Sequence, residues 1–306
     1  MRRYLSIAIL LLAPAAAFAQ APTPADYQAV LSALGKQGDF KDNVLRVNVP
    51  RNDLHVTIDG VATPTPFGFG GWLALTKGTG GMEVMMGDLV LTEDEVNPVM
   101  SALLNNGLDV TALHNHFFFD SPRIYYLHVH GHGSAADLAA KVKPALALIG
   151  ERPTDVSARQ APQGSVGTTG RAITGTLDSA SLAKIVGSDG EQNGAVYKIT
   201  IGRPDIALKE MGAAINARMG LNTWAAFYGS DADAVVAGDI AMLDREVTPV
   251  LKSLRSSGID VVAMHHHMTG VDPQVIFLHY WGKGDARKLA TAFRAAIDQT
   301  GARAKR

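Results

Sequence analysis

The chain has 306 residues, with 28 Lys and Arg, 29 Asp and Glu, 47% hydrophobic residues and no cysteine. The lack of cysteine excludes disulfides, thiolate metal ligands and a lipidated N-terminal cysteine. The near balance of charge excludes the basic surface that attracts nucleic acid or anionic lipid, so we expect no nucleic-acid partner.

The first 19 residues are typical of a secretory signal peptide. A charged Arg2-Arg3 pair precedes an apolar run at 5–12, and Ala17-Phe18-Ala19 fits a small-x-small cleavage site. That run is too short to span a bilayer, and no later stretch approaches about 18 uninterrupted apolar residues. We therefore expect a periplasmic or secreted protein without a membrane span, with 306 − 19 = 287 residues after cleavage.

Most of the remaining chain consists of two copies of one unit. Residues 44–51 align with residues 196–203 at an offset of 152, and later segments align at an offset of 151. An offset this long indicates a duplicated domain and not a short solenoid repeat. A segment rich in Gly, Ser, Thr, Pro and Gln separates the copies and is typical of a linker. We predict repeat domains at 24–152 and 173–303, joined by a linker at 153–172.

Within one copy, hydrophobic periodicity predicts short strands and a few helices. The first copy is expected to form helices at 25–34 and 134–148, a third helix that ends at Asn106-Gly107, and strands at 44–49, 54–59, 72–75, 83–91, 108–113 and 123–129. The last two strands are predicted to pair as a hairpin. The pattern predicts an α+β fold, with two tandem copies of a mostly antiparallel sheet and helices packed on one face.

Nine of the ten histidines lie in two equivalent stretches. Each stretch reads His-x-His, with a third histidine twelve residues after the second. The six residues are His114, His116 and His128 in the first copy, and His265, His267 and His279 in the second. Since the offsets 265 − 114, 267 − 116 and 279 − 128 are all 151, the motif was duplicated with the domain.

The spacing of these histidines predicts that three imidazoles converge in each copy. Residues i and i+2 of a strand point to the same face. If opposed residue numbers in the hairpin sum to 240, His114 faces Tyr126 and His128 faces Ala112, diagonal to His114. Imidazole suits Zn, Cu, Fe and Ni, and three protein ligands plus water is typical of catalytic zinc. We predict a divalent transition metal in each copy, zinc first and copper second; the alternative is a buried polar network that pins the hairpin.

Glu95 and Glu246 are repeated in the two copies and are our candidate catalytic residues. A glutamate beside three histidines is suited to act as a fourth ligand or as a general base on metal-bound water. A capping box from Thr92 to Glu95 is the structural alternative, but its Thr position is Leu243 in the second copy. A helix that begins at Asn97-Pro98 would leave Glu95 free to face the site.

Other repeated residues are expected to have structural roles. We predict that Asp88 and Asp239 lie at a turn or strand end, and that Trp72 and Trp224 are packing anchors. The Phe run at 117–119 cannot face one core as a whole, so one or two of its rings are expected to wall a pocket or an interface. The remaining histidines of the two stretches (His130, His132 and His266) are expected at surface or supporting positions, with His266 on the opposite face.

The chain resembles the LppY/LpqO-like family of exported bacterial proteins, a family of unknown function. The resemblance rests on residues 86–91, Glu95-Val96-Asn97-Pro98, 111–116, Ser121-Pro122-Arg123, His128 and 131–133, and it recurs in the second copy. It implies an exported protein with tandem copies, and it brings no activity for any residue.

Three functions are consistent with these patterns. The first is an exported metal-binding protein with a three-histidine site in each copy. The second is a metal-dependent hydrolase in which Glu95 or Glu246 is the base. The third is a non-enzymatic envelope protein that binds a small molecule, a polymer or another partner, with structural histidines. The sequence leaves open whether the two sites are separate or share one cleft.

Overall fold

The computed structural model describes residues 22–150 and 170–302. The expected signal peptide at 1–19 and residues 153–169 of the expected linker lie outside the described residues. No helix in the described ranges is long and apolar enough to cross a membrane.

The first copy forms a six-stranded antiparallel sheet in the order β1-β2-β5-β6-β9-β7. Its strands are β1 (Gly38–Lys41), β2 (Val44–Pro50), β5 (Gly70–Lys77), β6 (Glu83–Thr92), β7 (Asp109–His114) and β9 (Ile124–Gly133). Its helices are α1 (Ala25–Leu34), α2 (Glu93–Asn105) and α3 (Ala135–Leu146). Alternation along β2 directs Leu45 and Val47 into the core that the helices cover, because successive strand residues point to opposite faces.

The second copy repeats this sheet in the order β10-β11-β14-β15-β17-β16. Its strands are β10 (Gly190–Asn193), β11 (Val196–Gly202), β14 (Asn222–Gly229), β15 (Ala234–Leu243), β16 (Asp260–His265) and β17 (Val275–Gly284). Its helices are α4 (Ser179–Val186), α5 (Asp244–Ser256) and α6 (Ala286–Ile297). The equal strand order confirms that the sequence repeat is a repeat of the fold.

Short elements connect the long strands. They are β3 (Val56–Ile58), β4 (Val61–Thr63), β8 (Asp120–Ser121), β12 (Lys209–Glu210) and β13 (Ala213–Ala214), with 3-10 turns η1 (Thr65–Phe67), η2 (Thr79–Gly81) and η3 (Ala217–Met219). The predicted strand at 54–59 is thus shorter than expected, and it joins the small sheet β4-β3-β8 instead of a main sheet.

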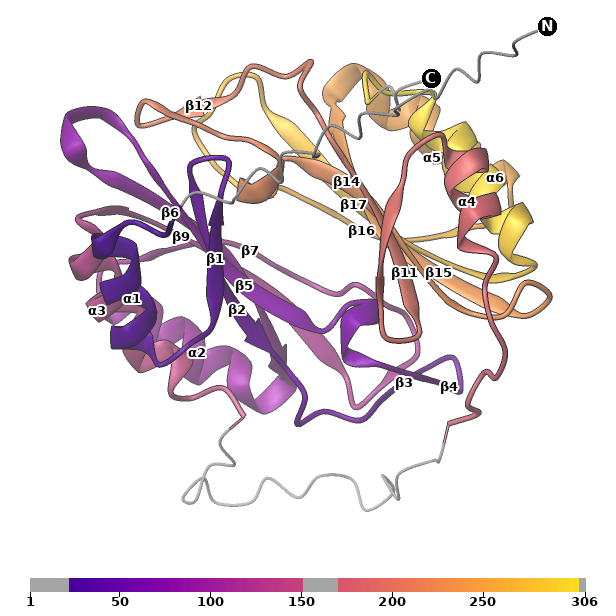
Figure 1. The fold of residues 1–306 in the computed structure, drawn as a ribbon, viewed down its shortest axis with the longest axis horizontal. Coiled ribbons are helices and arrows are strands. Elements are labelled where there is room, and N and C mark those ends of the chain that lie inside the picture. The colour runs from indigo at the N-terminus through magenta and orange to yellow at the C-terminus, as the bar shows by residue number, and fades with distance from the viewer. Residues whose placement is uncertain (1–21, 151–169, 303–306) are drawn as a thin grey trace, which may run out of the picture.

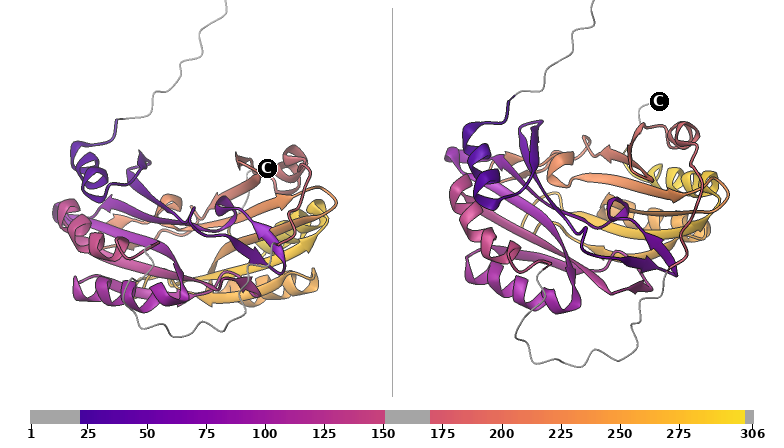
Figure 2. Two further views of the ribbon diagram at one scale, coloured as in Figure 1. Left: turned by 90° about the horizontal axis from the view of Figure 1, so that it is seen from below. Right: turned by 60° about the horizontal axis from the view of Figure 1, so that its bottom comes forward.

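The two sheets pack against each other and the helices lie on the outside. Figure 1 shows α1, α2 and α3 on one flank and α4, α5 and α6 on the other, with the strands between them. The two views of Figure 2 show the same arrangement of helices, sheet, sheet and helices. The prediction of antiparallel sheets with helices on one face is confirmed, and the other face of each sheet meets the other copy.

Two apolar clusters join the copies. One contains Phe67, Phe69 and Phe117 together with Val235 and Trp281. The other contains Ala74 and Met86 of the first sheet, packed with Phe277 and with buried apolar side chains between Ile206 and Leu221 of the second copy. Apolar burial of this kind stabilises the contact by roughly 25 cal/mol per Å². The contact between the two sheets therefore has a hydrophobic core of its own.

Candidate metal centre

The histidines lie on the inner faces of the two sheets. His114 ends β7 opposite Tyr126, and His128 on β9 is opposite Ala112. These pairs have residue numbers that sum to 240, so the predicted hairpin register is confirmed at this point. A register shift between Val110 and Ala112 changes the sum nearer the start of β7. In the second copy His265 pairs with Phe277 and His279 pairs with Ala263.

The structure brings the six predicted histidines into one cluster shared by both copies. The rings of His114 and His265 stack with their centroids 3.7 Å apart. His116 and His279 stack at 3.6 Å, and His128 and His267 at 4.2 Å. Each of these contacts joins one copy to the other. The sequence left open whether the two motifs share a cleft, and this arrangement shows that they meet.

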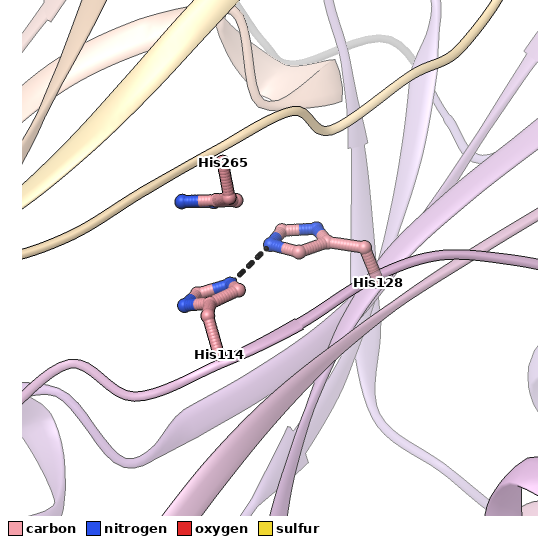
Figure 3. A group of neighbouring side chains, drawn as sticks. All are labelled: His114, His128 and His265. Atoms are coloured by element: carbon pink, nitrogen blue, oxygen red, sulfur yellow. Dashed lines mark hydrogen bonds between the residues drawn. The ribbon is translucent and has the colours of Figure 1, made fainter.

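Two groups of three histidines have ring nitrogens within 4.8 Å of one another, which is close enough to hold a metal ion. One group is His114, His128 and His265, and the other is His114, His116 and His279. Figure 3 shows the first group, in which His265 approaches the two first-copy rings from the opposite sheet. The Nε2 atoms of His114 and His128 are 3.0 Å apart. Both groups take ligands from both copies, unlike the grouping by copy that the sequence predicted.

The cluster is buried, and its imidazoles are neutral at pH 7. Burial lowers the pKa of His114 to about 4 and lowers the pKa values of the other five well below 6.5. Both ring nitrogens of His116 and of His265 lack a hydrogen-bond partner among the described residues. A neutral imidazole with an unpartnered nitrogen has a lone pair available for a metal.

The carboxylates of Asp88 and Asp239 lie beside the histidines. Asp88 on β6 pairs with His128 on β9, and Asp239 on β15 pairs with His279 on β17. An oxygen of Asp239 is 3.7 Å from Nε2 of His267, and an oxygen of Asp88 is 4.0 Å from Nε2 of His128. Burial raises the pKa of Asp88 to about 7 and that of Asp239 well above its ordinary value.

The prediction that Asp88 and Asp239 lie at a turn or strand end is wrong. Each lies in the middle of a ten-residue strand and faces the other copy. The available signal was their repetition at the centre of a strand, where the nearby side chains on both faces are apolar. A charged residue is costly at such a position unless it has a role there.

Glu95 lies in a different place, on the helical side of its sheet. Its carboxylate accepts hydrogen bonds from Arg51 at 2.6 and 3.0 Å and from the backbone N–H groups of Thr92 and Gly150. Helix α2 begins at Glu93, so the alternative start at Asn97-Pro98 is wrong.

Glu246 has the same environment in the second copy. It pairs with Arg203 at 3.0 Å and accepts from the N–H groups of Leu243 and Gly301. The glutamate half of a capping box needs only a backbone N–H, so Leu243 replaces Thr without loss of this bond. The structure does not bring Glu95 or Glu246 to the histidines. The repetition of Arg51 as Arg203 is the sequence signal for these ion pairs.

The accessory histidines have separate environments. His130 is buried and its Nε2 is 2.9 Å from Glu210 of the second copy, so it is not a surface residue. Nδ1 of His266 is 3.2 Å from the Val275 carbonyl oxygen. His132 and His55 are exposed.

The Phe run divides as expected. Phe117 is buried and packs against Phe67, Phe69 and Trp281 at the contact between the copies. Phe119 is 77% exposed and has a φ of 58°. The three rings therefore do not share one core.

A cavity of about 510 Å³ opens onto the cluster between the sheets. Its walls include His116, His267, His279, Asp88 and Asp239. Trp72 and Trp224, which we predicted as packing anchors, are half-buried and line this cavity. A small molecule of moderate size therefore has direct access to the histidines.

Comparisons with known proteins give a family without an assigned activity. A family model described as Domain of Unknown Function (DUF1259) matches residues 28–148 and 180–299, which is one match in each copy and more than half of the chain. No curated protein matches the chain.

Two solved structures show weak similarity. A trimeric bacterial microcompartment shell protein, PduB, is 14% identical, over 84% of this chain and 89% of that chain. EtuB from Clostridium kluyveri is 9% identical, over 90% of this chain and 93% of that chain. Both have a TM-score of 0.20.

Proposed function

The chain belongs to the family described as Domain of Unknown Function (DUF1259), and we propose that it is a metal-binding protein whose centre is shared by its two copies. One observation carries this proposal. Six buried histidines from both copies converge, and several of their ring nitrogens lack a hydrogen-bond partner among the described residues.

A purely structural histidine network accounts less well for this arrangement. A buried polar atom without a partner costs about 1–3 kcal/mol, so a network that only stabilises the fold satisfies its members. Here both nitrogens of His116 and His265 are without partners in the described structure. Binding of a metal would satisfy one nitrogen of each ring.

The ligands are proposed to divide into two crossed triads. Each takes the His-x-His pair of one copy and the third histidine of the other. The triads are His114, His116 and His279, and His265, His267 and His128. The ring nitrogens of the first triad lie within 4.8 Å of one another, whereas the other group within that distance contains His114 in place of His267. The second triad therefore rests on the ring-centroid distances alone. They are 5.2, 4.9 and 3.6 Å in the first triad and 5.1, 5.1 and 4.2 Å in the second.

Zinc is the first choice of metal and copper the second, because all six proposed ligands are imidazoles. Three imidazoles would hold each metal, and a metal held by three protein ligands would supply Lewis acidity to a bound molecule. Asp88 and Asp239 lie 4.0 and 3.7 Å from Nε2 of His128 and His267, and we propose that they hydrogen-bond these rings when metal binds, as carboxylates beside metal-bound histidines do. The catalytic role that we predicted for Glu95 and Glu246 is not part of this proposal, since their carboxylates are bound to Arg51 and Arg203.

The cellular setting is also proposed. The N-terminal pattern and the resemblance to the LppY/LpqO-like family support export to the periplasm or beyond, with cleavage after Ala19. Domain limits of 24–152 and 173–303 are consistent with the two family matches.

The proposal is tested by the metal content of the mature protein, purified without a histidine tag and measured by elemental mass spectrometry. We expect about two metal ions per chain, and substantial loss of both in His114→Ala/His265→Ala. The matched control is His55→Ala/His132→Ala, which removes two exposed histidines outside the cluster. Absence of metal, and of uptake on titration with zinc or copper, would overturn the proposal.

A further inference from the structure

The cavity beside the histidines carries a pair of cations without carboxylate partners. Arg46 on β2 and Lys198 on β11 hold equivalent positions in the two copies, since 198 − 46 = 152. Neither forms an ion pair with a carboxylate among the described residues. The Arg46 guanidinium donates to the carbonyl oxygen of Arg218 at 2.7 Å, and the Lys198 ammonium makes no hydrogen bond in the described structure.

Two tryptophans hold these cations over the cavity. The guanidinium carbon of Arg46 lies 3.7 Å from the ring centroid of Trp72, and Nζ of Lys198 lies 4.1 Å from that of Trp224. Such cation–π contacts stabilise a cation by about 0.5–2 kcal/mol without neutralising its charge. The position of each side chain is therefore fixed while its charge stays available.

The sheet register places a tryptophan between each cation and the buried carboxylate of its copy, so Asp88 and Asp239 act on the cations through their charge but form no ion pair with them. Trp72 on β5 pairs with Asn48 of β2 on one side and with Asp88 of β6 on the other. Trp224 likewise lies on β14, between the strands of Lys198 and Asp239. The exposed acids Asp42, Asp189 and Glu191 line the rim and form no ion pair with either cation.

Arg46 and Lys198 are close enough to affect each other. Burial and, to a smaller extent, the charge of Arg46 lower the pKa of Lys198 to about 8, against the opposite effect of Asp239, Asp88 and Glu191. The ammonium is still mostly protonated at neutral pH. A third cation, Arg218, lines the same cavity; it forms an ion pair with Asp39 at 2.7 Å, and its buried Nε lacks a hydrogen-bond partner among the described residues. Like charges held together in this way favour an anion between them.

We propose that the cavity binds a small organic anion, a carboxylate or a phosphate ester, whose charged group lies between Arg46 and Lys198. A volume of about 510 Å³ accommodates a ligand larger than an inorganic ion. His116, His267 and His279 line the same space, so an anion held by the cations reaches the proposed metals. Only the contact of the anion with a metal rests on the proposed metal centre. Its contact with Arg46 and Lys198 does not.

The test is calorimetric titration of the full chain with phenyl phosphate and with benzoate. Both the metal-loaded and the metal-free protein are titrated. We expect at least one of the two probes to bind the metal-loaded wild type. Its affinity for metal-loaded Arg46→Met/Lys198→Met should be at least tenfold lower. Metal content should be unchanged in this variant. The control is Arg245→Met/Lys252→Met, which removes two exposed cations of α5. The single variant Lys198→Met serves if the double variant does not fold, because Lys198 makes no hydrogen bond in the described structure.

The outcomes separate this inference from the metal proposal. If metal binds but neither probe does, or if the variant binds as tightly as the wild type, the anion site is overturned and the metal centre stands. If no metal binds, a probe that binds the metal-free wild type and not the variant still supports the cation pair. If no metal and no probe binds, both proposals are overturned.

Discussion

The rings of His114 and His265 stack with centroids 3.7 Å apart, although 265 − 114 = 151 residues separate them. They hold equivalent positions in the two copies. On either side of them, His116 contacts His279 and His267 contacts His128. Exchanging each residue for its equivalent in the other copy converts one of these contacts into the other. The cluster therefore has approximate two-fold symmetry, and its centre lies between these two rings.

Metal should stabilise the folded protein measurably. A ligand that binds only the native state at 100 times its dissociation constant adds about 2.7 kcal/mol. Thermal unfolding of the metal-free protein should therefore occur at a lower temperature, and zinc should reverse the change. In His114→Ala/His265→Ala the zinc-dependent shift should be lost, whereas His55→Ala/His132→Ala should keep it. A zinc-dependent shift of wild-type size in His114→Ala/His265→Ala would contradict this prediction.

Loss of the Glu95 carboxylate should destabilise the fold without changing metal content. Glu95 and Arg51 are both buried, and removal of one partner of a buried ion pair costs about 3–5 kcal/mol. Glu95→Ala should show this loss in urea unfolding, and Glu93→Ala, an exposed change in the same helical turn, should not. Loss of metal from a folded Glu95→Ala protein would instead indicate that Glu95 contributes to the metal site.

Stability should fall in acid through Asp53 and Asp205. Hydrogen bonds from Arg51 and Arg203 lower the pKa values of these carboxyls in the folded state. Their contribution is fully present above the ordinary pKa of about 4 and is lost as the pH falls through the folded values. The unfolding free energy of Asp53→Asn/Asp205→Asn should therefore vary less between about pH 5 and pH 2 than that of the wild type. Equal slopes would show that the two ion pairs do not contribute.

Gly220 should be required for the position of His267. Its φ is +96°, and an added Cβ would lie 3.1 Å from Trp72 and 3.2 Å from Nδ1 of His267. Gly220→Ala should destabilise by about 1 kcal/mol or more through backbone strain and weaken metal binding about tenfold. Gly270→Ala provides the control, because it has a φ of +73° and open space around the added Cβ. Equal metal affinity in both variants would refute a positioning role.

Much of the fold followed from local patterns. The helix at 25–34 has the predicted bounds, and the hairpin register places His114 opposite Tyr126 as expected. Strand alternation and turn residues determine these features, and the residues involved lie close together in the sequence. The paired arginines and glutamates were visible as repeats, but their partnership depends on the first turn of helix α2 lying beside Arg51, which follows β2.

The shared site was not predictable in the same way. The contact of His116 with His279 requires two sheets to pack face to face, and neither hairpin contains that information. The apolar inner residues around Phe117 and Phe277 drive this packing, but in the sequence they are indistinguishable from residues that face the helices. Asp88 was misplaced for the same reason, since the opposing copy gives it its surroundings.

The crossed triads are the central claim, and two double variants test it most directly. His116→Ala/His279→Ala removes two ligands of one proposed site and none of the other, although the residues belong to different copies. His116→Ala/His128→Ala removes one ligand from each proposed site, although both residues belong to the first copy. Metal content and affinity are measured for both by elemental mass spectrometry and zinc titration.

We predict that His116→Ala/His279→Ala keeps one metal per chain at wild-type affinity, whereas His116→Ala/His128→Ala binds both metals weakly or not at all. The reverse result, with one tight metal retained only in His116→Ala/His128→Ala, would show that each copy holds its own metal. Equal losses in the two variants would also contradict the crossed arrangement.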